Sequence, residues 1–109
     1  MITKQFLDGC PDGKSLKVTG TVLGSANTIH TGHATNKDEV WLYAVNNDTI
    51  SRELSVFIDD QETSVVSLPV KQGLLLIIPG LPVSNSQTVK VFAAAANVVF
   101  VSGWVNRIG

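Results

Sequence analysis

Disulfides, long apolar segments and strong charge are all missing from this chain of 109 residues. Cys10 is the only cysteine, so no disulfide can form within the chain and no metal site built from several thiolates is available. The longest aliphatic run, Leu74–Ile78, is too short to cross a bilayer, and residues 1–10 hold no basic stretch followed by an apolar one. We therefore expect a protein that is made and used in solution and that owes its stability to packing.

Charged residues are scarce and of mixed sign. They make up 16% of the chain, against about 25% in a typical soluble domain, and the formal net charge is −1. Because Lys and Arg are scattered, binding to nucleic acid or to an anionic membrane is not expected. Apolar residues reach 44%, which favours a surface partly covered by a partner. The alternative is an ordinary exterior on which Ser, Thr, Asn and Gly take the place of charge.

Short β-branched and aromatic runs separated by turn residues predict an all-β fold, an antiparallel β-sandwich of jelly-roll or immunoglobulin-like type with about seven to eight short strands. Turn residues such as Asn46-Asn47-Asp48 and Pro79-Gly80 indicate short connections and pairing between consecutive strands. The expected strands are Ser15–Leu23, Glu39–Asn46, Ser51–Ile58, Thr63–Val70, Leu74–Ile78, Gln87–Ala94 and Val98–Asn106.

Two longer segments interrupt this pattern. Residues 1–14 are interpreted as an N-terminal arm or an edge, so that residues 15–109 form the single sandwich domain. Gly24–Asp38 is a polar excursion with room for a short strand near Thr28–His30. We expect both segments to reach neighbouring proteins, and deletion of residues 1–15 to leave the domain folded.

Several strands are apolar on both faces. Along Val40–Val45, alternate residues place Val40, Leu42 and Ala44 on one face and Trp41, Tyr43 and Val45 on the other. Val98–Val105 shows the same pattern. An antiparallel sandwich usually keeps one polar, hydrated face on each sheet, so these strands predict oligomerisation or docking. Alternatively, the first fourteen residues and the Gly24–Asp38 segment cover them.

Neither metal binding nor catalysis has a convincing set of residues. His30 and His33, with Asp38 and Glu39 nearby, could approach one metal ion, but a solvated loop is the preferred interpretation. The acidic run Asp59, Asp60 and Glu62 lacks the spacing of a calcium loop and is interpreted as a hairpin tip. No Gly-x-Ser-x-Gly elbow and no glycine-rich phosphate loop occur. We therefore expect no enzyme, no cofactor and no metal.

The aromatic residues are the remaining candidates for function. Trp41, Tyr43 and Trp104 are interpreted first as interior packing and second as interface anchors, because Trp and Tyr are enriched at the centres of interfaces. They could also form a stacking platform for a sugar. The complete set of predicted interface residues is Phe6, Leu7, Trp41, Tyr43, Phe100 and Trp104.

Two stretches resemble a known class of proteins. From Thr28 to Ile58 the chain contains Thr-Ile-His-Thr, then Asp-Glu-Val-Trp-Leu-Tyr-Ala-Val-Asn-Asn and Leu-Ser-Val-Phe-Ile. From Gly73 onward it contains Gly-Leu-Leu-Leu-Ile-Ile-Pro-Gly-Leu, Val-Lys-Val-Phe-Ala-Ala-Ala-Ala-Asn-Val-Val and a closing Ser-Gly-Trp-Val-Asn-Arg-Ile. Together they span about two thirds of the chain. In both, the chain is similar to small β-sandwich virion proteins of tailed bacteriophages.

This resemblance implies a non-enzymatic virion protein, made in the host cytoplasm and placed on the capsid exterior. The first expectation is a cement or decoration protein that bridges neighbouring major capsid subunits, with copies of itself, as a dimer or trimer, and the major capsid protein as partners. A tail or fibre component is the alternative. A second alternative is a carbohydrate- or receptor-binding module, and only there would a glycan be the ligand.

Overall fold

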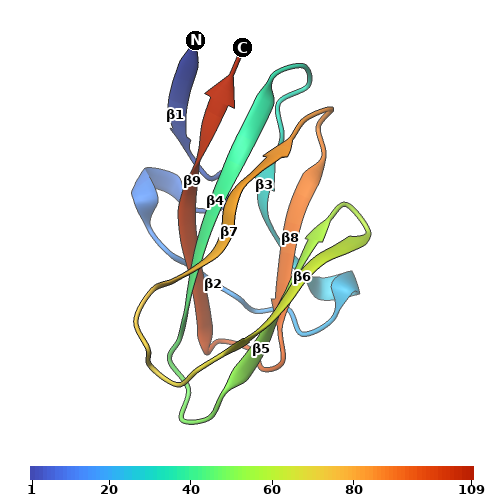
Figure 1. The fold of residues 1–109 in the computed structure, drawn as a ribbon. Coiled ribbons are helices and arrows are strands. Elements are labelled where there is room, and N and C mark those ends of the chain that lie inside the picture. The colour runs from blue at the N-terminus through green and yellow to red at the C-terminus, as the bar shows by residue number, and fades with distance from the viewer.

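Nine β-strands form two antiparallel sheets in the computed structural model, which describes residues 1–109 (Figure 1). The predicted all-β sandwich is confirmed, with nine strands in place of seven to eight. The five-stranded sheet contains β1 (Ile2–Phe6), β2 (Leu16–Lys17), β4 (Lys37–Asn46), β7 (Leu75–Val83) and β9 (Val99–Ile108). The four-stranded sheet contains β3 (Asn27–Thr31), β5 (Arg52–Ile58), β6 (Gln61–Leu68) and β8 (Thr88–Ala93). Two short 3-10 turns, η1 (Pro11–Gly13) and η2 (Leu23–Ser25), lie in the early loops.

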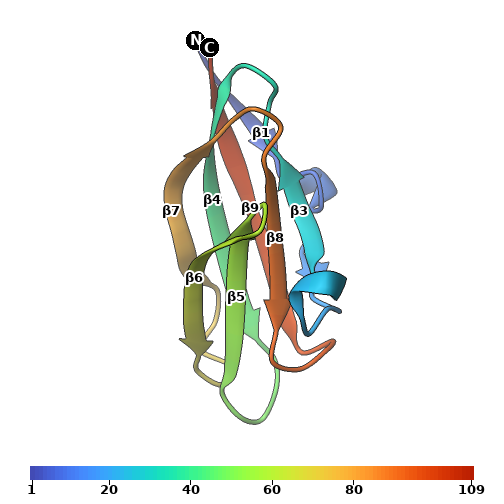
Figure 2. The same cartoon turned by 90° about the vertical axis from the view of Figure 1, so that its right-hand side faces the viewer.

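The strands pair from the outside of the sequence inward. β1 and β2 pair with β9, β3 with β8, β4 with β7, and β5 with β6. Winding this long ribbon over itself also brings β4 beside β9 and β5 beside β8, which is the connectivity of a jelly roll (Figure 2). The prediction that consecutive strands pair was therefore wrong except at the β5–β6 hairpin. Most connections cross from one sheet to the other, so short loops do not imply neighbouring strands here.

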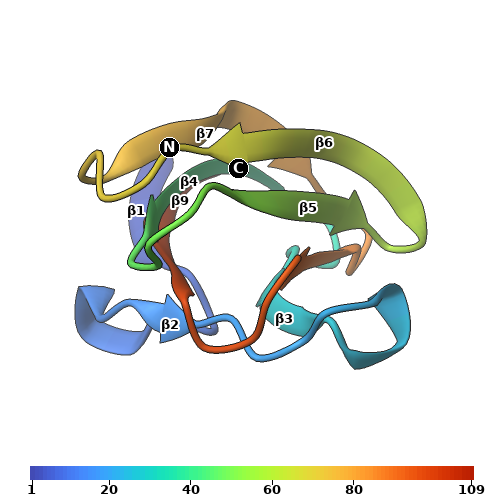
Figure 3. The ribbon, with the colours of Figure 1, turned by 90° about the horizontal axis from the view of Figure 1, so that it is seen from below.

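The two sheets face each other as the layers of a sandwich (Figure 3). One apolar core cluster of 18 buried residues lies between them. The inner face of β4 contributes Val40, Leu42 and Ala44, which alternate along the strand as predicted and are all buried. The other strands add alternate Val, Ile and Leu residues in the same way. No helix in the structure has the length and apolar character needed to span a membrane.

The N-terminal residues belong to the sandwich and do not form a free arm. β1 pairs with the end of β9 from Ile2 opposite Ile108 to Phe6 opposite Trp104. The chain then turns inward, and both Leu7 and Cys10 are buried in the core. Of the two interpretations of residues 1–14, the structure therefore shows an edge strand followed by a packed loop.

Two predicted strand boundaries need correction. Only Leu16–Lys17 of the expected strand Ser15–Leu23 is a strand, because the chain crosses to the other sheet at Gly20, where a Cβ atom would lie 2.1 Å from the Ser25 carbonyl oxygen. In the second half, Pro79-Gly80 does not end a strand. β7 continues to Val83 through two register shifts against β4. Proline is tolerated there because β7 is an edge strand.

Candidate interaction surface

The outer face of the five-stranded sheet gathers the aromatic residues of three strands. Trp104 of β9 lies directly opposite Trp41 of β4 and also opposite Phe6 of β1. Tyr43, two residues after Trp41 on β4, points to the same outer face. Residues 6, 41 and 104 are far apart in sequence and meet only because β9 runs between β1 and β4.

The three largest rings pack against one another across the strands. The ring centroids of Trp41 and Trp104 are 5.9 Å apart with an interplanar angle of 11°, and those of Tyr43 and Trp104 are 5.5 Å apart at 28°. The Lys4 ammonium lies 5.4 Å from the Trp104 ring centroid. Each aromatic pair contributes about 0.5–1.5 kcal/mol beyond its buried area. Trp104 thus stacks on two rings of β4 and lies beside a cation of β1.

Two glycines make room for this stack. Gly80 has φ +81°, and a Cβ atom there would lie 3.1 Å from Trp41 Cζ2. Gly103, beside Trp104 on β9, has φ +154°, and a Cβ atom there would lie 1.9 Å from the Trp41 carbonyl oxygen. A side chain at either position would displace Trp41 or the strand that carries it, so both glycines fix where the stack sits.

A groove of about 580 Å³ opens beside the stack. Phe6, Tyr43, Leu74 and Trp104 supply its apolar lining, and Lys4 is the only charged residue in it; the other lining residues are Gln5, Gly13, Ser102 and Gly103. Phe6 is 56% exposed and Leu74 is 57% exposed. Leu76, opposite Tyr43 on β7, is 47% exposed. We call this area, formed by Lys4, Phe6, Trp41, Tyr43, Leu74, Leu76 and Trp104, the aromatic surface.

The structure brings four of the six predicted interface residues together. Phe6, Trp41, Tyr43 and Trp104 all belong to the aromatic surface. Phe100 lies farther along the same face, opposite Val45, and is half-buried. Leu7 is 1% exposed and packs in the core, so it is not accessible to a partner in this fold. The N-terminal loop borders the aromatic surface at Gly13, which lies against the Phe6 ring, and the rim residues Phe6, Leu74 and Leu76 remain about half exposed.

Three members of the aromatic surface were not predicted from the sequence. Leu74 and Leu76 lie in an aliphatic run whose two faces look alike, so the sequence gives no reason to single them out. Lys4 is one of several scattered cations, and its position over Trp104 depends on the pairing of β1 with β9. The indole Nε1 atoms of Trp41 and Trp104 have no hydrogen-bond acceptor within the chain.

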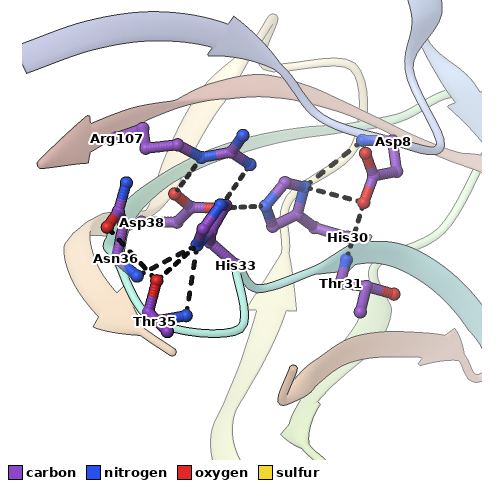
Figure 4. A network of polar contacts seen from close by, with 8 residues as sticks. All are labelled: Asp8, His30, Thr31, His33, Thr35, Asn36, Asp38 and Arg107. Atoms are coloured by element: carbon purple, nitrogen blue, oxygen red, sulfur yellow. Dashed lines mark hydrogen bonds and ion pairs between the residues drawn. The ribbon is translucent and has the colours of Figure 1, made fainter. Parts of the chain in front are cut away.

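A buried polar network lies at the end of the sandwich near both termini (Figure 4). Asp38 on β4 is fully buried and accepts hydrogen bonds from Arg107 Nε at 2.8 Å and Arg107 Nη2 at 3.0 Å. His30 Nε2 lies 2.8 Å from Asp38 Oδ2, the oxygen that also accepts the hydrogen bond from Arg107 Nη2. His30 Nδ1 is 3.4 Å from the Asp8 backbone N–H and 3.3 Å from Asp8 Oδ2. These contacts tie β3, β4, β9 and the loop after β1 together.

The electrostatics of the network keep Asp38 ionised. Burial would raise the pKa of Asp38, but the hydrogen bonds and charge of Arg107 and His30 outweigh burial and hold this pKa below its usual value. The hydrogen bond to Asp38 in turn raises the pKa of Arg107. Both ring nitrogens of His30 face Asp38 and Asp8, and neither faces a hydroxyl or thiol group. The arrangement is that of a structural ion pair with a supporting imidazole.

The interpretation of the two histidines as parts of a solvated loop was wrong for His30. His30 lies on β3, is 1% exposed and is held by carboxylates on both sides. His33 lies in the following turn, where its Nδ1 accepts hydrogen bonds from the backbone N–H groups of Thr35 and Asn36. The two rings thus have separate partners, and no group of three or more His, Cys, Asp or Glu side chains is arranged to hold a metal ion.

The acidic run lies at the β5–β6 hairpin, as its sequence indicated. Asp59 adopts φ 54° in the turn and accepts hydrogen bonds from the backbone N–H and the hydroxyl of Thr88. Asp60 and Glu62 are exposed. The Asp59 carboxylate therefore fastens the hairpin tip to β8.

Comparison of the chain with protein-family models, with curated proteins and with solved structures finds no match.

Proposed function

We propose that this chain is a non-enzymatic structural protein that binds neighbouring subunits of a larger assembly through the aromatic surface. The observation that carries the proposal is the half-exposed apolar rim, Phe6, Leu74 and Leu76, set around a rigid stack of Trp41, Tyr43 and Trp104. Rims of this kind around anchored aromatic residues are typical of binding sites. Covering each half-exposed rim side chain contributes about 1 kcal/mol.

The sequence resemblance to virion proteins of tailed bacteriophages identifies the assembly that we propose. In the proposed phage capsid, the chain is a cement or decoration protein on the exterior, and its partners are major capsid subunits and copies of itself. Jelly rolls occur in viral capsid domains and also in lectins. The fold is therefore compatible with a capsid role but does not distinguish it from carbohydrate binding. Many weak, repeated contacts around a shell add up to firm attachment.

The contact we propose is with an apolar segment of a capsid subunit that enters the groove. Phe6, Tyr43, Leu74 and Trp104 give the groove an apolar lining, and Lys4 is the only charged residue there. An acidic residue beside an apolar side chain on the capsid subunit would complement this combination. Since Lys4 also lies over Trp104, a carboxylate placed there would contact the cation without displacing the stack.

The test uses purified virions that carry the chain. Mass spectrometry is expected to find it in a fixed ratio to the major capsid protein, and electron microscopy is expected to show its density between capsid subunits. Phe6→Ala and Leu74→Ser, at exposed rim positions, are expected to lower the occupancy, whereas Val22→Ser, 59% exposed and outside the aromatic surface, leaves it unchanged. Absence of the chain from virions, or full occupancy with both rim variants, contradicts the proposal.

A carbohydrate-binding module is the second candidate, because the groove has the volume and aromatic lining of a small-molecule site. Against it, the Trp104 ring already stacks on Trp41 and Tyr43 and lies beside the Lys4 ammonium, so a sugar would compete with these contacts. Titration with glycans, followed by tryptophan fluorescence, separates the two functions. A saturable change that Phe6→Ala abolishes would favour the carbohydrate module, and an unchanged spectrum favours the structural protein.

A further inference from the structure

The four outer edges of the two sheets differ in how well they are protected against pairing with another strand. On the five-stranded sheet, the β7 edge contains Pro79 and Pro82, which have no N–H to donate. The β1 edge carries Lys4 at its centre. Prolines and lysines at these positions are ordinary means of preventing edge-to-edge association.

The β3 edge of the four-stranded sheet is covered by the chain itself. The Gly9 N–H donates to the Ile29 carbonyl oxygen at 2.8 Å. Asp8 Oδ2 accepts a hydrogen bond from the Thr31 N–H, also at 2.8 Å. The loop that follows β1 thus occupies the positions where another strand would pair.

The β6 edge has neither kind of protection over most of its length. β6 pairs only with β5. Apart from β5, one other segment forms a hydrogen bond with the β6 backbone: Asn46 Nδ2 donates to the Leu68 carbonyl oxygen. The ladder shifts at Thr63 and is regular from Ser64 to Leu68. This stretch contains no proline and no charged residue, and Val65 within it is 45% exposed. Alternate backbone N–H and C=O groups of such a strand point away from the sheet.

We infer that the edge of β6 is a self-association site, at which a second copy of this chain adds its own β6 in antiparallel orientation. A two-fold axis normal to the sheet keeps the inner faces of both copies on one side and the outer faces on the other. Ser64 and Val66 of one copy then meet inner-face residues of the second copy, and the core against which Val66 packs continues across the junction.

Charge and chemistry favour a second copy as the occupant. Because Thr63–Leu68 has no charged side chain, antiparallel self-pairing over this stretch opposes no like charges. The same self-pairing at β1 would bring Lys4 close to Lys4 of the second copy. Self-pairing at β7 would lack the backbone hydrogen bonds that Pro79 and Pro82 cannot donate. The result is a continuous eight-stranded sheet, and the aromatic surfaces of both copies remain free because they lie on the other sheet.

The test is the solution mass of the full chain, measured by light scattering and sedimentation from low micromolar to sub-millimolar concentration. The wild-type chain is expected to move toward twice 11.6 kDa as concentration rises. Val65→Lys, at an exposed position on the edge, is expected to raise the dimer dissociation constant by at least about tenfold. Ile50→Lys, at a loop position that is 55% exposed, is the matched control and leaves dimerisation unchanged.

Phe6→Lys separates this site from the aromatic surface. Dimerisation that survives Phe6→Lys and is lost in Val65→Lys supports pairing at β6. A wild-type chain that stays monomeric throughout, or a dimer that Phe6→Lys abolishes and Val65→Lys does not, overturns the inference. Circular dichroism and thermal unfolding of each variant show that the change acts on association and not on the fold. The outcome is independent of whether the aromatic surface binds a capsid subunit.

Discussion

Replacing Asp38 by Asn removes the carboxylate that joins β3, β4 and β9. The buried oxygens of Asp38 accept two hydrogen bonds from Arg107 and contact His30 Nε2, all at 2.8–3.0 Å. Breaking a buried ion pair by removing one partner costs about 3–5 kcal/mol. The Arg107 side chain is 27% exposed and can regain water, so we expect the lower end, a loss of about 3 kcal/mol in the free energy of unfolding at pH 7.

The effect of this substitution should depend on pH in a defined direction. The pKa of Asp38 is lower in the folded chain than in the unfolded chain, so ionised Asp38 stabilises the fold. This contribution is fully present above the unfolded pKa of about 4 and is lost as the pH falls through the lower, folded pKa. The difference in stability between the wild-type chain and Asp38→Asn is therefore expected to be largest near neutral pH and to shrink in acid.

Urea denaturation followed by tryptophan fluorescence measures this difference from neutral pH down to the acid range. Asp60→Asn is the matched control, because Asp60 is exposed at the hairpin tip and makes no hydrogen bond through its side chain. Its stability should stay within about 0.5 kcal/mol of the wild type. A loss below about 1 kcal/mol for Asp38→Asn at pH 7, or a loss that does not change with pH, would refute the role assigned to the network.

Three further predictions test the packing. Gly103→Ala places a methyl group against the Trp41 carbonyl oxygen, and in chemical denaturation it is expected to lower the free energy of unfolding by at least about 3 kcal/mol. The control Gly24→Ala, which has open space around it, should stay within about 0.5 kcal/mol of the wild type. Equal stabilities of the two variants would contradict the close contact at Gly103. Burial raises the pKa of the Cys10 thiol, so Ellman's reagent should react with it only after denaturant is added, and rapid reaction of the native chain would show that the core is open there. Deleting residues 1–15 removes β1, Leu7 and Cys10, so a cooperative thermal transition should be absent, contrary to the expectation from sequence; a retained transition would show that β1 is dispensable.

The face assignments could be predicted from the sequence because they depend on local alternation. Trp41 and Tyr43 on the outer face and Leu42 and Ala44 on the inner face follow from the two-residue period of a strand alone. The strand order could not be obtained in this way. In a jelly roll, most pairing partners are distant in the sequence, and short loops connect strands of different sheets.

The same limit explains what was missed at the site. Arg107 reaches Asp38 across 69 positions of sequence, and nothing around either residue indicates the other. The short strand allowed near Thr28–His30 is present as β3, but the burial of His30 depends on Asp38 and Asp8, which are distant in the sequence or on another strand, so the solvated-loop interpretation was wrong for it. The convergence of Leu74 and Lys4 on Trp104 likewise depends on the neighbours of β9 and β4 in the sheet.

The most direct measurement of the central claim is hydroxyl-radical footprinting of the chain, free in solution and in purified virions. Oxidation of Phe6 and Leu74, both more than half exposed in the free chain, is expected to fall several-fold on assembly, while Val22, equally exposed but outside the aromatic surface, stays as reactive as before. Equal oxidation of Phe6 and Leu74 in the two states would show that nothing covers the aromatic surface, and would contradict the proposed docking role.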